Sequence, residues 1–209
     1  MENNEKPNIK ISIFDSFKKI ISRGNYETLI ETLMNASQCV FKGEYEHINS
    51  QAYGECDFIE KSTGEKFDAK LCFEKEEGKL IGAPNGDVKE WILKMNEYFT
   101  DVDANLEPEN LKIYKLLEKK MNSLKDDENL ILYIPFPLSM YVQGVHEIVV
   151  TNTIEIAYNE LNEKNLLKGR KIYVIFPIDS GMALYDVKQR KYEPIKTPIF
   201  NEYIKYENI

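Results

Sequence analysis

The spacing of apolar residues along the chain predicts helices over several segments. Between residues 13 and 41, apolar side chains recur at helical spacing in two stripes, which is typical of a pair of amphipathic helices. Gly24 and Asn25 stand between the stripes and predict a break there. Three further helices are expected, at about residues 87–99, 108–124 and 151–167.

Other segments have the pattern of strands. Residues 56–82 contain β-leaning stretches joined by Lys61-Ser62-Thr63-Gly64, a sequence typical of a tight turn. Continuous apolar runs at 130–135 and 172–177 indicate strands buried on both faces, and 182–187 is expected to form an edge strand. Because strands and helices alternate in the second half, we predict an α/β fold, a partly parallel sheet flanked by helices.

Length and composition favour one globular domain. The chain has 209 residues, of which 43% are hydrophobic, so it can bury a sizeable core. We expect a flexible arm at 1–9 and a single domain over 10–209, with no membrane span, because no apolar run approaches the ~18 residues that a span needs. Cys39, Cys56 and Cys72 are far apart and form no CxxC motif, which argues against a disulfide scaffold and favours a cytoplasmic protein.

The predicted hairpin around the turn at 61–64 carries the candidate chemistry. If its strands are antiparallel, Phe58 faces Phe67 and Asp57 faces Asp68, while strand alternation puts Lys70 on the face of Asp68. Two facing carboxylates destabilise a sheet unless a cation lies between them. Their oxygens suit Mg²⁺ or Mn²⁺, and a nearby lysine can hold the attacking water. The pattern therefore predicts metal-assisted hydrolysis of a phosphodiester.

The spacing Asp57, ten residues, then Asp68-Ala69-Lys70 resembles the PD-(D/E)XK nuclease superfamily, over about residues 25–75. The resemblance implies a restriction-endonuclease-like fold, a mixed central sheet flanked by helices. It also implies that Asp57 and Asp68 ligate Mg²⁺, that Lys70 positions water, and that a glutamate on the preceding helix completes the ligands. Glu31 is our choice for this helical acid, with Glu27, one turn earlier, as the substitute.

Two departures from the family pattern leave an alternative open. Cys56 stands where the family commonly has proline, and the second acid is Asp rather than the more frequent Glu. The hairpin can also be interpreted as a solvated one, in which Lys70 forms an ordinary surface ion pair with Asp68 or Asp57. A separate alternative is that the chain keeps the nuclease-like scaffold and is a non-catalytic protein-binding or inhibitory factor.

Charge bears on the choice of partner. The chain has 35 acidic and 27 basic side chains and a net charge of −8, whereas phosphate neutralisation drives most nucleic-acid affinity. Binding to DNA would need local basic surface, and the candidates are Lys168, Arg170, Lys171 and Arg190. Lys168, Arg170 and Lys171 can equally cap the helix that precedes them. An acidic surface would meet a basic protein partner, and the resemblance also leaves a homodimer open.

Overall fold

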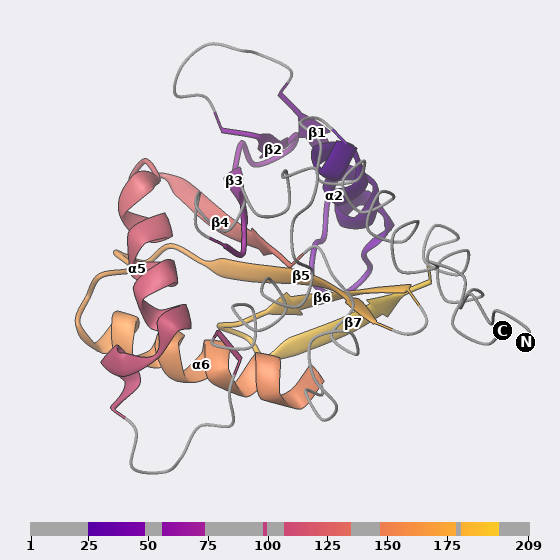
Figure 1. Cartoon of the computed structure of the whole chain (residues 1–209). Coiled ribbons are helices and arrows are strands. Elements are labelled where there is room, and N and C mark those ends of the chain that lie inside the picture. The colour runs from indigo at the N-terminus through magenta and orange to yellow at the C-terminus, as the bar shows by residue number, and fades with distance from the viewer. Residues whose placement is uncertain are drawn as a thin grey trace, which may run out of the picture.

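The computed structural model describes residues 25–48, 56–73, 98–99, 107–134, 147–178 and 181–196. These residues form one seven-stranded mixed sheet with helices packed against it (Figure 1). The predicted α/β class is therefore confirmed. The expected arm at 1–9, the helix before Gly24, most of the helix at 87–99 and the C-terminal tail lie outside the described residues.

The strands follow one another across the sheet in chain order, and β3, β4 and β5 run parallel. Helices α5 and α6 lie in the two connections between the parallel strands. All other neighbours are antiparallel. The elements are α2 (Asn25–Ala36), β1 (Tyr45–His47), β2 (Phe58–Glu60), β3 (Lys66–Leu71), a 3₁₀ turn (Pro108–Asn110), α5 (Lys112–Ser123), β4 (Glu128–Tyr133), α6 (Glu147–Glu163), β5 (Ile172–Ile178), β6 (Gly181–Asp186) and β7 (Lys191–Ile195).

The apolar runs form the centre of the sheet. Every residue of β4, β5 and β6 is buried, as expected for strands covered on both faces. Strand β6 pairs with β5 on one side and β7 on the other, so the edge position expected for 182–187 is wrong. The strand outside it, β7, is mostly exposed and polar, and its pattern did not predict a strand.

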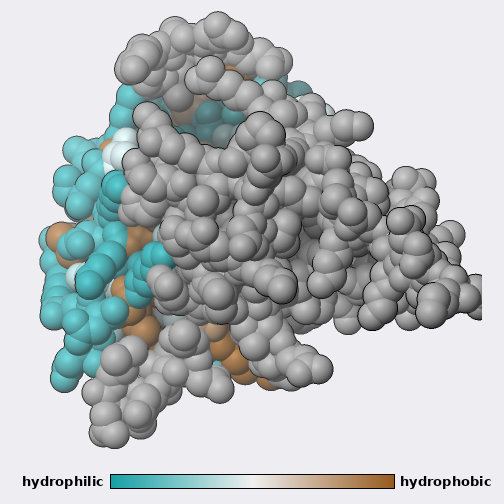
Figure 2. All heavy atoms as spheres, in the orientation of Figure 1, coloured by the Kyte–Doolittle hydropathy of each residue, from teal (hydrophilic) through white to brown (hydrophobic). Residues whose placement is uncertain are grey.

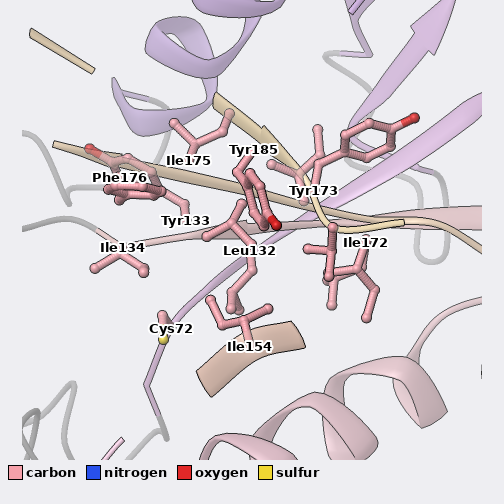
Figure 3. Packing of buried hydrophobic residues seen from close by; sticks show 14 of the residues in the cluster. Cys72, Leu132, Tyr133, Ile134, Ile154, Ile172, Tyr173, Ile175, Phe176 and Tyr185 are labelled. Carbon is pink, nitrogen blue, oxygen red and sulfur yellow. The ribbon is translucent and has the colours of Figure 1, made fainter. Parts of the chain in front are cut away.

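Two layers of side chains cover the sheet. On one side, Phe41 packs edge-on against Phe67 of β3 at 6.0 Å between ring centroids, and Tyr26 of α2 stacks on Tyr133 of β4. On the other side, Ile154 of α6 lies close to Leu132 of β4 (Figure 3). The sheet is thus the middle of a helix–sheet–helix sandwich.

Helix α5 shows how amphipathicity places a helix. Its buried side is apolar, and the surface over this part of the molecule is mostly hydrophilic (Figure 2). The buried residues are Ile113, Tyr114, Leu116, Leu117 and Met121. In the part of the chain that the structure describes, no helix combines the length and the apolar character that crossing a membrane requires.

Helix α2 begins at Asn25, where the sequence predicts a break, but it ends at Ala36 rather than near Phe41. After Ala36, the backbone N–H groups of Gln38, Cys39 and Val40 donate to the carboxylate of Glu193 instead of continuing the helix. A partner that lies far away in the sequence therefore decides where this helix stops.

Candidate functional site

The β2–β3 hairpin has the predicted register. Phe58 lies opposite Phe67, and Ile59 opposite Lys66. The N–H of Gly64 donates to the carbonyl of Glu60 at 2.8 Å and closes the turn, and Gly64 has φ +72°, which glycine adopts without strain. The register prediction is therefore confirmed over the paired residues. Asp57 and Asp68 are the next two positions of the hairpin beyond the pair of Phe58 and Phe67.

The carboxylate of Glu60 organises this turn. It accepts hydrogen bonds from the N–H and hydroxyl groups of Ser62 and Thr63, at 2.6–3.1 Å. These bonds, the strongest from the Thr63 hydroxyl, lower the pKa of Glu60 to about 2. Glu60 is thus a structural acid that fixes the bend between the two strands of the candidate site.

The side chain of Asp57 bonds to the backbone of the neighbouring strand β3. Its carbonyl accepts from the N–H of Ile48 at 2.8 Å. Its Oδ2 accepts from the N–H of Ala69 at 2.7 Å, in the strand beside it. This bond fastens the Asp57 carboxylate to β3, next to Asp68.

Asp68 is a buried acid held by a lysine. Its residue is only 7% exposed, and Lys70 Nζ lies 2.8 Å from Oδ1 and 2.6 Å from Oδ2. Burial, and then a hydrogen bond shared with the Asp57 carboxyl, raise the pKa of Asp68 to about 7 against the opposing effect of Lys70. The structure therefore brings Asp57, Asp68 and Lys70 together.

The first turn of α2 reaches the same place. The ring of Tyr26 stacks on Tyr133 with 6.1 Å between centroids and 7° between planes. Burial raises the pKa of the Tyr26 hydroxyl, and the negative charges of Glu27, Asp57 and Asp68 raise it further. Tyr26 was missed at the sequence level. The available signal was its position directly before the substitute helical acid.

The two candidate helical acids have different surroundings. Glu31 Oε1 accepts from the backbone N–H of His47 at 3.0 Å, so this carboxylate ties α2 to β1. Glu27 Oε2 lies 3.3 Å from His47 Nε2, and its charge acts on Tyr26, which also senses Asp57. The Glu31 carboxylate, the first choice, is therefore bonded to β1, whereas the substitute Glu27 lies beside His47 and Tyr26.

The basic residues predicted to contact nucleic acid are engaged within the protein. Arg170 is buried, and its guanidinium donates to the carbonyls of Leu167 and Met121, each at 3.0 Å. This position does not suit a phosphate contact, because the guanidinium binds the backbone at the ends of α6 and α5. The other three pair with carboxylates: Lys168 with Asp126, Lys171 with Glu65 and Arg190 with Glu155.

The donor set of the site is a pair of carboxylates with a lysine beside it. Among the described residues, no three His, Cys, Asp or Glu side chains gather closely enough to hold a metal ion together. Mg²⁺ in proteins commonly takes one or two carboxylates and completes its shell with water and phosphate oxygens. Asp57 and Asp68 fit that kind of site.

Comparison with known proteins adds no assignment. No protein-family model, curated protein or solved structure matches this chain. Membership of the PD-(D/E)XK superfamily stays a prediction from the residues around the hairpin. Among the described residues, Asp57, Asp68 and Lys70 are the ones whose geometry bears on a function.

Proposed function

We propose that the protein is a metal-dependent hydrolase of phosphodiester bonds, with DNA as the substrate. The observation that carries the proposal is the adjacent pair Asp57 and Asp68, one of them buried, with Lys70 bonded to Asp68. Two carboxylates so placed repel each other and oppose folding unless a cation compensates their charge. The cost of keeping them together supports a functional role over a purely structural one.

The two acids would share the task of holding the cation. Asp57 has one oxygen bonded to the Ala69 N–H, which fixes the direction of the carboxylate, and a cation would take the place of the hydrogen bond that Asp57 shares with Asp68. Asp68 would present an oxygen from the adjacent strand position. When bound, Mg²⁺ or Mn²⁺ supplies a Lewis acid that lowers the pKa of a coordinated water.

Lys70 would act on the water and on the phosphate. Its side chain is one-third exposed, so the ammonium can move away from one Asp68 oxygen without displacing core side chains. It can then donate to the attacking water, and to a phosphate oxygen as negative charge develops there. Glu27, held by His47, supplies further negative charge on the same side of the site.

Metal titration and cleavage of plasmid and single-stranded DNA test this proposal. Lys70→Met is expected to retain Mn²⁺ binding and to lower cleavage at least about 100-fold, because it removes the donor to the reacting groups. Asp68→Asn is expected to lose Mn²⁺ binding and cleavage together, because it removes a ligand oxygen's charge.

Lys66 and Asp127 provide a matched control. They form a lysine–aspartate pair at 2.5 Å that involves the same strand, with Lys66 two residues before Asp68 and bonded to Asp127. Lys66→Met and Asp127→Asn are expected to retain both Mn²⁺ binding and cleavage. Wild-type protein that binds no Mn²⁺, or that cleaves as well with Lys70→Met, would contradict the proposed function.

A second candidate function is a non-catalytic factor that binds a basic protein. The observation that favours it is the state of the four predicted nucleic-acid contacts, which are buried or paired with carboxylates, in a chain of net charge −8. This function predicts that partner affinity survives Asp68→Asn. Mn²⁺ binding by the wild-type protein, lost in that variant, would decide for the hydrolase.

A further inference from the structure

The carboxylate of Glu193, on the last strand β7, lies inside the loop that follows α2. One oxygen accepts from the N–H of Gln38 at 2.7 Å. The other accepts from the Ser37 hydroxyl at 2.5 Å and from the N–H groups of Cys39 and Val40 at 3.1 and 3.0 Å. These partners are 153 to 156 positions away in the sequence. We refer to this contact between Glu193 and residues 37–40 as the Glu193 clamp.

The electrostatics show that the clamp is made by an ionised carboxylate. Burial by itself raises the pKa of Glu193, but the hydrogen bonds from Ser37 and the three N–H groups outweigh burial and lower it. The Ser37 hydroxyl also accepts from the N–H of Phe41 at 2.8 Å, so the loop is folded around the anion. Phe41 in turn packs on Tyr173 of β5 at 4.6 Å between centroids.

Polar side chains of α2 form hydrogen bonds to the backbone of β1. These bonds join helix α2, the following loop and β1 into one unit. Asn35 accepts from the N–H of Tyr45 at 2.8 Å and donates to its carbonyl at 2.9 Å. Nearer the start of the helix, Glu31 accepts from the N–H of His47. Among the described residues, the polar ties of this unit to the rest of the sheet include the short β1–β2 ladder, the bonds of Ile48 to Asp57 and of Lys61 to Glu44, and the Glu193 clamp.

We propose that Glu193 is a positioning residue that holds α2 in the orientation that keeps Tyr26 and Glu27 beside Asp57 and Asp68. This inference rests on the proposed function of that site. A helix of 12 residues is a rod about 18 Å long, so a tilt at its clamped C-terminal end moves its N-terminal end. The clamp therefore acts on the site from the opposite end of the helix.

Hydrogen exchange and Mn²⁺ titration on the full chain test the inference together. In Glu193→Ala, exchange in 25–36 and 45–48 is expected to quicken about 10-fold or more, because bonds to a charged acceptor are lost. Mn²⁺ affinity is expected to fall about 10-fold, as when a group that orients metal ligands is removed. Glu193→Gln keeps an acceptor oxygen and is expected to recover part of both losses.

Glu155→Gln is the matched control. Glu155, on α6, is likewise a carboxylate with partners in distant elements, Tyr185 and Arg190. It is expected to change neither exchange in α2 nor Mn²⁺ affinity. Exchange in α2 that stays unchanged in Glu193→Ala, or an equal fall of Mn²⁺ affinity in Glu155→Gln, overturns the positioning role alone. Wild-type protein that binds no Mn²⁺ overturns the proposed function, and the positioning role with it.

Discussion

Asp68 shows how a single residue can work against the fold that contains it. A buried carboxyl next to another carboxyl disfavours its own charge, and the lysine that grips it only partly offsets this effect. Under the proposed function, Asp68 serves to bind the cation at a cost in stability. Its titration consequently gives a test of the site that needs no substrate.

We expect Asp68→Asn to stabilise the protein at pH 8. The folded-state pKa of Asp68 is raised from 3.8 to about 7, so the folded protein binds this proton more tightly than the unfolded chain. The wild-type free energy of unfolding therefore falls as the pH rises from 3.8 to about 7, and the neutral amide avoids the loss. Urea unfolding is expected to show a gain in the free energy of unfolding of at most about 4 kcal/mol at pH 8 and almost none at pH 4.

Asp127→Asn is the control for this titration. The bond from Lys66 lowers the pKa of Asp127, which is the opposite direction to Asp68. Removing the charge of Asp127 is therefore expected to give no gain in the free energy of unfolding at pH 8. A gain of equal size in both variants would show that the effect does not come from the acid pair.

At the scale of elements, the hairpin depends on its turn. Glu60 bonds to Ser62 and Thr63 and so sets the bend that brings Asp57 opposite Asp68. Gly43 makes room for this carboxylate, because a Cβ there would lie 2.6 Å from Glu60 Oε1. One acid and one glycine thus determine the geometry between two strands.

The stability that Glu60 contributes is expected to depend on pH. Its pKa is lowered from 4.5 to about 2, so the contribution is present above pH 4.5 and is lost as the pH falls from 4.5 toward 2. Thr63→Val removes the strongest donor and should raise this pKa. NMR titration of the Glu60 carboxyl would show the change, and an unaltered pKa in the variant would contradict the role of Thr63.

At the scale of the whole molecule, Arg170 joins the helix layer at one end of the parallel strands. Its guanidinium bonds to the carbonyl of Leu167 after α6 and to those of Met121 and Lys125 around the end of α5. A cation at the C-terminal ends of helices also compensates their dipoles. The residue thus links the two crossover helices through carbonyls that also accept backbone N–H groups.

Arg170→Met is expected to lower the free energy of unfolding by about 2–4 kcal/mol, because it removes the hydrogen bonds of a buried charged donor to three carbonyls. Denaturant unfolding measures this change. Lys168→Met is the control, since its pair with Asp126 is exposed and is expected to contribute at most about 1 kcal/mol. A nearly unchanged Arg170→Met protein would contradict the structural role.

The sequence by itself determined the hairpin and the buried strands, because both depend on local patterns. Strand alternation and a four-residue turn are sufficient to place Phe58 opposite Phe67 and to bring the acid pair together. Uninterrupted apolar runs are likewise sufficient to identify β4 and β5 as central strands.

Only the tertiary structure decided the contacts between distant segments. It determined that the Glu31 carboxylate is bonded to the backbone of β1 while Glu27 lies beside His47, since the direction of α2 depends on β1 and on Glu193. It also determined that Arg170 is buried and that β6 is not an edge strand. The physical reason is the same in each case: the energy comes from partners brought together by folding, and the spacing of residues along the chain contains no record of them.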